Sequence, residues 1–168
     1  MKPSDALTVP VRYLPTNLTP ADKQRQKRML VKSRRKYDQG QYVSRQRLKS
    51  FHSRTSKHMN RARELYHVNT ISPNKSLARA TGCTVDALRK IVSKGEGAYF
   101  SSGSRPNQTA QSWGMARLAS AITGQKAAAV DYHILELGCN HRKKAFILAK
   151  QSRKKHGFGH RSTRKVTV

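Results

Sequence analysis

Residues 77–92 decide the fold, and they read LARATGCTVDALRKIV. Ala78 places a small residue where a second helix can approach, and Gly82 suits the turn because glycine adopts positive φ without strain. Leu88 and Ile91 then fall on one face of a following helix. The stretch therefore predicts a helix-turn-helix-like pair, and it places the chain among small, mainly α proteins.

This helix pair has two interpretations. In a DNA-binding unit the start of the second helix lies near the groove, and the candidate DNA contacts are Thr84, Arg89 and Lys90. Asp86 opposes that interpretation, because its carboxylate would lie beside phosphates or base edges. A packed helical hairpin that binds nothing satisfies the same pattern and is the simpler interpretation.

Helix signals continue on both sides of this pair. Thr19 provides a hydroxyl cap, Pro20 suits the first helical position, and Gly40 suits a helix end. Residues 126–137 are apolar enough for a helix or a strand, and Gly138 favours the helix. The other predicted helices cover residues 20–37, 56–66, 72–81, 85–93, 110–123 and 140–155.

A long Gly/Ser-rich loop is predicted at residues 94–108, where Gly95 ends the preceding helix. Loops of this composition can hold a phosphate through backbone N–H groups, although the order of a Walker loop is absent. The candidate contacts to a partner or a phosphate are Lys94, Ser101, Ser102, Ser104, Arg105 and Asn107. An ordered structural loop, in which glycine and proline set the turns, is the competing and favoured interpretation.

Four segments are expected along the chain. Residues 1–18 contain three prolines and predict an extended arm, and residues 19–68 form a basic helical segment. Residues 69–155 form the central helical domain. Residues 156–168 form a basic tail that we expect to be disordered unless it is bound.

The charge of the chain is strongly unbalanced. It has 35 Lys and Arg against 8 Asp and Glu, for a formal net charge of +27. Residues 1–68 hold 17 basic and 4 acidic side chains, and residues 141–168 hold 10 basic and no acidic ones. So many like charges repel one another in a compact body and imply an anionic partner. Nucleic acid is the default, and anionic lipid or an acidic protein surface satisfies the same physics.

Catalytic and metal-binding patterns are weak. Cys83 and Cys139 are two lone cysteines that do not predict a disulfide framework. The zinc signal around His133 and His141 is poor, because a second cysteine pair is missing. No apolar run follows Met1, so we expect no signal peptide, and a protein that is intracellular or part of something assembled inside a cell. We expect no enzyme, no catalytic residues, no cofactor and no metal.

One stretch carries a resemblance to a known group of proteins. Residues 94–120 read KGEGAYFSSGSRPNQTAQSWGMARLAS, and they follow the helix pair and a basic segment at 22–66. Together these features resemble a family of small uncharacterised proteins from large icosahedral DNA viruses of algae and amoebae, chlorovirus-like ones in particular. The resemblance covers about residues 13–149.

The resemblance implies a structural virion protein, assembled in the infected host cell. The preferred version is a minor capsid protein that cements the capsid shell, with the major capsid protein and other minor capsid proteins as its partners. Viral genomic DNA or an anionic inner membrane are further partners that the basic flanks suit. The alternative is a DNA-binding or DNA-condensing protein of the virion core, which would use the basic flanks and the helix-turn-helix-like unit. The family supplies no catalytic residues.

Overall fold

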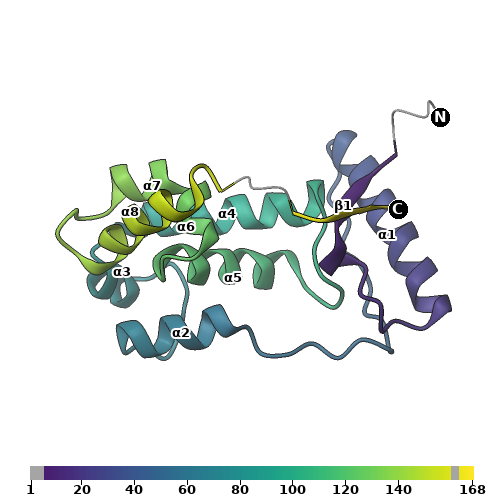
Figure 1. The fold of residues 1–168 in the computed structure, drawn as a ribbon, viewed down its shortest axis with the longest axis horizontal. Helices are drawn as coiled ribbons and strands as arrows, with labels where there is room; N and C mark the ends of the chain where they lie inside the picture. Colours follow the sequence, from purple (N-terminus) through teal and green to yellow (C-terminus); the bar gives the residue numbers. More distant parts are fainter. Residues whose placement is uncertain (1–5, 160–162) are drawn as a thin grey trace. The chain divides into compact units, whose positions relative to one another are not determined.

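The computed structural model describes residues 6–159 and 163–168, and over these residues the chain is mainly helical, as the sequence predicts (Figure 1). Residues 1–5 of the predicted arm and 160–162 of the predicted tail lie outside the described residues. Within the described residues, no helix has both the length and the apolar character required to cross a lipid bilayer.

The chain divides into two compact units that cut across the four segments expected from the sequence. Unit 1 consists of Met1–Arg54, Gly97–Ala110 and Ser162–Val168, and unit 2 consists of Thr55–Glu96 and Gln111–Arg161. Residues from three separate stretches therefore fold together in unit 1.

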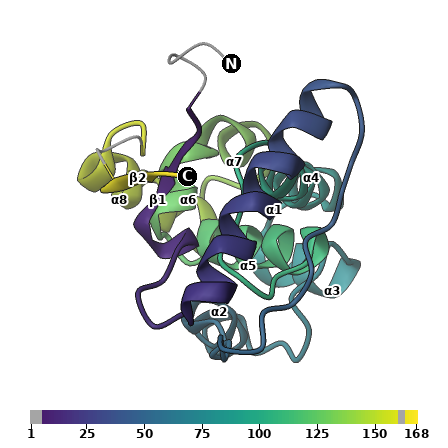
Figure 2. The same ribbon diagram turned by 90° about the vertical axis from the view of Figure 1, so that its right-hand side faces the viewer.

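Both ends of the described chain meet in unit 1. Strand β1 (Thr8–Pro10) pairs with strand β2 (Lys165–Thr167) (Figure 2). The pairing is antiparallel, and Val9 lies opposite Val166. The expected disorder of the tail is therefore wrong for residues 163–168. The physical reason is apolar burial, since Val9 is fully buried and Val166 packs against a cluster of buried leucines, Leu14, Leu18 and Leu48.

Helix α1 (Pro20–Asp38) follows the short 3-10 helix η2 (Val11–Tyr13). Its predicted start is confirmed, because the Thr19 hydroxyl accepts a hydrogen bond from the Asp22 N–H and proline occupies the first position. The helix ends where Gly40 adopts a φ of 76° and the Gln41 N–H donates to the carbonyl of Lys36 at 2.8 Å. This is the Schellman arrangement, which glycine favours.

Unit 2 is a packed set of helices. They are α2 (Lys57–Tyr66), α3 (Lys75–Thr81), α4 (Val85–Ser101), α5 (Ala110–Ile122), α6 (Lys126–Val130), α7 (Tyr132–Gly138) and α8 (Lys144–His156), of which α4 and α5 reach into unit 1 at their adjoining ends. Helices α6 and α7 pack against α8. The helical prediction for 126–137 is confirmed, as two short helices that meet at Asp131.

Helix α4 overturns one prediction. The sequence ends this helix at Gly95, but α4 continues to Ser101 and the following loop is correspondingly shorter. A Cβ on Gly95 would lie 2.6 Å from the Cα of Gly114, and one on Gly114 would lie 2.6 Å from the Val92 carbonyl oxygen. Gly95 is therefore a point of close approach between α4 and α5. A glycine at such a point resembles a helix end when only the neighbouring residues are considered.

Candidate nucleic-acid interface

Helix α1 of unit 1 carries the densest run of positive charge on a regular element. Eight of its nineteen residues are Lys or Arg, and its buried residues are Asp22, Gln26, Leu30 and Ser33. These four repeat at helical spacing, so one narrow face is buried and the basic residues occupy the rest. Arg28, Lys32 and Arg35 are exposed and lie at i, i+4 and i+7, in a stripe opposite the buried face.

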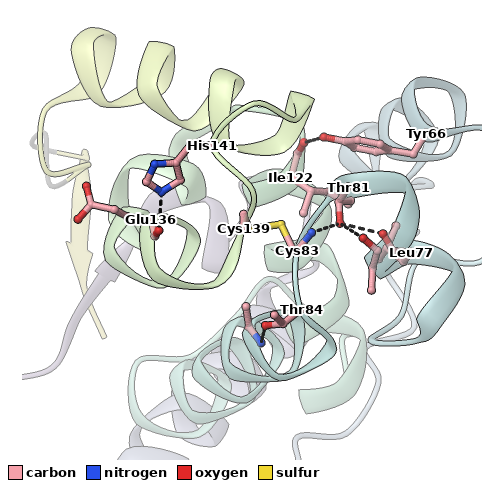
Figure 3. The surroundings of a disulfide bond; sticks show 11 residues. Tyr66, Leu77, Thr81, Cys83, Thr84, Ile122, Glu136, Cys139 and His141 are labelled. Atoms are coloured by element: carbon pink, nitrogen blue, oxygen red, sulfur yellow. Dashed lines mark hydrogen bonds between the residues drawn. A yellow bond between two sulfur atoms is a disulfide. The ribbon is translucent and has the colours of Figure 1, made fainter.

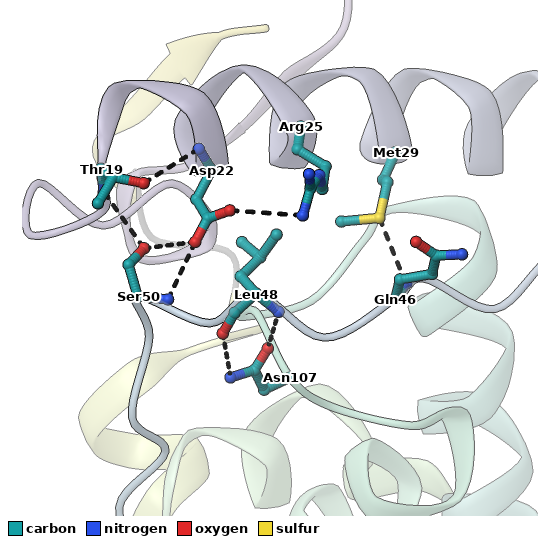
Figure 4. Close-up of polar contacts among 8 residues, drawn as sticks. All are labelled: Thr19, Asp22, Arg25, Met29, Gln46, Leu48, Ser50 and Asn107. Carbon is teal, nitrogen blue, oxygen red and sulfur yellow. Dashed lines mark hydrogen bonds and ion pairs between the residues drawn. The ribbon is translucent and has the colours of Figure 1, made fainter.

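The acid at the start of α1 is directed inward, away from this stripe. The Asp22 carboxylate accepts hydrogen bonds from the Ser50 hydroxyl at 2.6 Å and the Ser50 N–H at 2.9 Å, and it lies 3.7 Å from the Arg25 guanidinium (Figure 4). The two bonds from Ser50 are the main reason that the pKa of Asp22 is lowered from its ordinary value, with Arg25 adding a smaller attraction. Asp22 thus fixes the 41–54 segment to α1 and leaves the stripe uncompensated.

Asn107, which the sequence predicts as a contact to a partner or a phosphate, binds the backbone of the 41–54 segment and acts as a polar clamp within unit 1. Its side-chain oxygen accepts from the Leu48 N–H at 2.7 Å, and its amide donates to the Leu48 carbonyl at 3.2 Å (Figure 4). The same amide donates to the Phe51 carbonyl at 2.7 Å. Its backbone has a φ of 62°, a conformation that asparagine tolerates better than most residues. These three hydrogen bonds satisfy backbone N–H and C=O groups of the 41–54 segment, which is irregular and is not paired with a strand.

Arg45 is a site residue that the sequence analysis missed. Its guanidinium donates to the hydroxyls of Ser33 at 2.8 Å and Ser104 at 2.9 Å, and it lies 3.8 Å from the centre of the Tyr99 ring. Burial lowers the pKa of this guanidinium, and within the described part of the chain it has no carboxylate partner. No local pattern distinguishes Arg45 from the other basic residues around it.

The remaining loop candidates do not form one phosphate site. Ser104 is buried against Arg45 and donates its hydroxyl to the Arg105 carbonyl at 2.8 Å. Ser102 and Arg105 are exposed, and the Ser101 carbonyl accepts from the Arg34 guanidinium at 2.7 Å. Lys94 belongs to unit 2, where its amine lies 3.4 Å from the carboxylate of Asp131.

Asp131 explains why Lys94 is held in place. Its carboxylate is fully buried and accepts two bonds from the Arg117 guanidinium, at 2.7 and 2.8 Å. Paired donors of this kind make a strong, directional contact with a carboxylate. Lys94 adds a third interaction from α4. Arg117 and Lys94 therefore join two helices of unit 2 to the α6–α7 junction.

The helix pair at 77–92 has the geometry that the sequence predicts. Helix α3 ends at Thr81, Gly82 has a φ of 79°, and the Thr84 hydroxyl caps α4 by accepting from the Ala87 N–H at 3.1 Å. The alternative DNA contacts Thr84, Arg89 and Lys90 line an open groove that α4 shares with α7. Asp86 lines it too and forms an ion pair with Lys90 at 3.2 Å, which reduces the positive charge there.

A disulfide joins Cys83 to Cys139 beside this helix pair (Figure 3). The two cysteines face each other in a short antiparallel bridge, which the Thr84 N–H and the Asn140 N–H close with bonds of 2.8 Å to the Gly138 and Gly82 carbonyls. The expectation of two lone cysteines is therefore wrong. The pairing spans 56 residues, and no local spacing indicates it.

The weak zinc pattern also has a different arrangement. Cys139 is bonded to Cys83, and the His141 ring lies 2.7 Å from the Glu136 carbonyl oxygen (Figure 3). The same ring stacks on Phe146, with 3.9 Å between the ring centres. Over residues 6–159 and 163–168, no group of three His, Cys, Asp or Glu side chains is placed to hold a metal ion.

Comparison with known proteins gives a match to a protein family. Residues 10–134 match the protein family described as a family of unknown function, DUF5824. No curated protein and no solved structure matches the chain. The matched residues include α1, the 41–54 segment and the helix pair, so the family covers most of both units.

Proposed function

We propose a function for this chain, which belongs to the DUF5824 family, from its own charges and contacts: it binds nucleic acid through the basic stripe of α1. The observation that carries the proposal is that the stripe of Arg28, Lys32 and Arg35 is exposed, while Asp22, the acid at the start of the helix, is bound by Ser50. A row of three cations along about two turns of the helix suits a phosphate backbone, whose counterions are released on binding.

The proposal describes a binding protein and assigns no catalytic residue. Ser104 and Asn107 would be prominent in an enzyme site built on the 102–109 loop, but their polar atoms bind Arg45 and the backbone of Leu48 and Phe51. The recognition is of phosphate, so we expect little dependence on base sequence.

Salt-dependent binding to a DNA duplex tests this function. Replacing Arg28, Lys32 and Arg35 by Gln keeps helix propensity and removes three cations. We expect the slope of log affinity against log salt to fall by about 2 to 3, since each phosphate contact contributes about 0.9. The matched control replaces Lys150, Lys154 and Lys155, which are exposed on α8 in unit 2, and it should leave most of the slope in place.

Two results would contradict the proposal. Absence of binding by the unmodified chain at low salt would exclude nucleic acid as the partner. Equal losses in the α1 and α8 variants would show that overall charge, and not the stripe, governs the affinity. Circular dichroism of each variant checks that α1 and α8 still form.

A structural role in a virion is the second candidate, and the resemblance of residues 94–120 supports it. In this version the chain cements the capsid shell as a minor capsid protein. Fractionation of purified particles of the encoding virus tests it: the chain should remain with the shell after the genome and core are removed, and its complete loss with the core would exclude the cementing role.

A further inference from the structure

Unit 1 holds an exposed aromatic residue, Tyr42, beside two other rings. Its ring centre lies 6.1 Å from that of Tyr37 and 5.2 Å from that of Phe100, with interplanar angles of 59° and 55°. Tilted contacts support a ring without covering one of its faces as a parallel stack would. Tyr42 is also 69% exposed, so most of its surface faces solvent. We call Tyr37, Tyr42 and Phe100 the Tyr42 platform.

The backbone around Tyr42 is fixed on both sides. Before it, the turn at Gly40 holds the Gln41 N–H to the carbonyl of Lys36, which returns the chain toward α1. After it, the Val43 carbonyl lies 3.4 Å from the Ser33 hydroxyl. An exposed aromatic ring on a fixed backbone loses little conformational entropy when it binds a flat ligand.

Two guanidinium groups lie along the same row of rings. Arg45 lies over Tyr99, whose ring meets Phe100 edge-on at 5.0 Å. Arg34 donates to the carbonyl of Ser101, the residue that follows Phe100. The Asp38 carboxylate lies 3.6 Å from the Arg34 guanidinium and offsets part of its charge. The platform thus continues from the C-terminal end of the basic helix to the Arg45 guanidinium. Aromatic rings within a basic surface are the combination by which proteins bind single-stranded nucleic acid.

We propose that the Tyr42 platform stacks an unpaired nucleobase while the basic residues of α1 hold the adjoining phosphates. This rests on the proposed function and adds a substrate class, single-stranded nucleic acid. The bases of a duplex are stacked on one another, so their faces are closed to Tyr42, whereas an unpaired base offers its face to a ring. The contact is tolerant of base identity because every base has such a face.

Three variants test the platform. Tyr42→Ala removes the ring, and Tyr42→Trp restores an aromatic surface at the same position. The matched control is Phe158→Ala, because Phe158 is 70% exposed, belongs to unit 2 and has the Arg153 guanidinium 4.1 Å from its ring centre. Both sites are on the surface, and thermal melting of each of the three variants checks that the fold is unchanged.

Four probes at one salt concentration separate the contributions of base and phosphate. They are a single-stranded DNA, an RNA of the same sequence, the corresponding DNA duplex, and a DNA strand of the same length made of abasic residues. We expect Tyr42→Ala to lose roughly 5- to 150-fold in affinity for the probes with unpaired bases, the range of one base–aromatic stack. Duplex and abasic affinities should not change. The ratio between the loss of affinity for the single-stranded DNA and the loss for the RNA shows whether the platform prefers DNA or RNA.

The outcomes distinguish this inference from the function on which it rests. If the unmodified chain binds no probe, the proposed function fails. If it binds the duplex and the single strand but Tyr42→Ala changes neither, or changes both equally, the platform is not a base-stacking site. A loss with Phe158→Ala equal to that with Tyr42→Ala would also overturn it. So would a change in sedimentation without a change in binding, since Tyr42 would then contact a second copy.

Discussion

In unit 2, twenty buried residues form one apolar cluster, and seventeen of them lie on seven helices. In the described part of unit 1 fewer apolar residues are buried, namely Val9, Tyr13, Leu14, Leu18, Leu30, Leu48 and Tyr99, and several polar side chains are buried with them. Unit 1 therefore depends also on polar contacts between distant stretches. Asp22 binds Ser50, Asn107 binds the Leu48 backbone, and Arg45 binds Ser104. The difference teaches that an irregular, highly basic segment can be ordered by a few hydrogen-bonding side chains when apolar residues are scarce.

The two kinds of interaction differ in strength. A buried leucine contributes about 2 to 5 kcal/mol, as measured by truncation to alanine. A hydrogen bond within the protein contributes only about 0.5 to 1.5 kcal/mol. We therefore expect amide hydrogens of the 41–54 segment in unit 1 to exchange with solvent faster than those of α4 and α5 in unit 2. We also expect the basic surface and the Tyr42 platform to lie in the less stable of the two units.

The largest expected effect concerns the disulfide of unit 2. Replacing Cys83 and Cys139 by Ala removes a cross-link over 56 residues, and the chain-entropy relation gives a loss of about 4 kcal/mol. Urea unfolding measures the loss. Amide exchange should show that protection falls in α3 and α7 while protection in unit 1 changes less. The difference in stability between the two units would then be smaller. Reductant should destabilise the unmodified chain and leave the double variant unaffected; an unchanged urea midpoint would contradict the prediction.

The next effect concerns the buried acid of unit 2. Asp131→Asn leaves the Arg117 guanidinium without its carboxylate, and loss of one partner of a buried pair costs about 3 to 4 kcal/mol. Asp86→Asn is the matched control, because Asp86 pairs with Lys90 on the surface of the same protein and such pairs contribute about 0 to 1 kcal/mol. Thermal unfolding compares the two. Similar shifts in both would mean that Asp131 does not hold α4 and α5 to the α6–α7 junction.

The helices, Gly95 and the disulfide show which parts of the fold a sequence can and cannot predict. The helices of unit 2 follow from apolar spacing, and the starts of α4 and α1 follow from Thr84 and from Thr19 and Pro20, because each signal lies within a few residues of its effect. The helix starts expected at 72 and 140 are wrong, since α3 begins at Lys75 after the Asn74 cap and α8 begins at Lys144. The helix end predicted at Gly95 is wrong because a glycine is needed there for close contact with Gly114, which belongs to another helix. The disulfide was missed because its two halves come together only when α3 and α7 are folded.

The candidate site was predicted less well than the fold, for a related reason. Arg45 acquires its role from Ser33, Tyr99 and Ser104, and these residues come from different stretches of the chain. Asn107 carried a usable signal, since asparagine after proline is typical of a turn and tolerates the left-handed conformation. Its contact with Leu48 had no such signal. Tyr42 was not distinguished, because exposure cannot be read from one aromatic residue in a basic segment.

A smaller effect is expected at the polar clamp of unit 1. Asn107→Ala leaves the Leu48 N–H and the Phe51 carbonyl without this partner, and we expect a loss of about 2 kcal/mol. Asn107→Gly separates the causes, because glycine accepts the φ of 62° and lacks only the hydrogen bonds. Arg105→Ala is the control, since Arg105 is exposed on the same loop. Amide exchange at residues 48–51 reports the change; unchanged protection there would show that the clamp does not order the segment.

The smallest expected effect is the pH dependence of the Asp22 contact. Because hydrogen bonds from Ser50 lower the pKa of Asp22 below its ordinary 3.8, its stabilising contribution is complete above that pH and is lost as the pH falls through the lower value of the folded state. Ser50→Ala removes the hydroxyl donor and should move the pKa of Asp22 upward. The titration of its carboxyl carbon by NMR measures this shift.

Arg25→Gln is the comparison for this last prediction, because Arg25 contributes less to the lowered pKa than Ser50 does. We therefore expect a smaller upward shift in Arg25→Gln than in Ser50→Ala. A larger shift in Arg25→Gln would mean that the ion pair, and not the hydrogen bond across 28 residues, holds the carboxylate. In that case the Asp22 carboxylate would be held within α1 by Arg25, without the 41–54 segment. The Asp22–Ser50 contact would then no longer count among the three polar contacts that order unit 1.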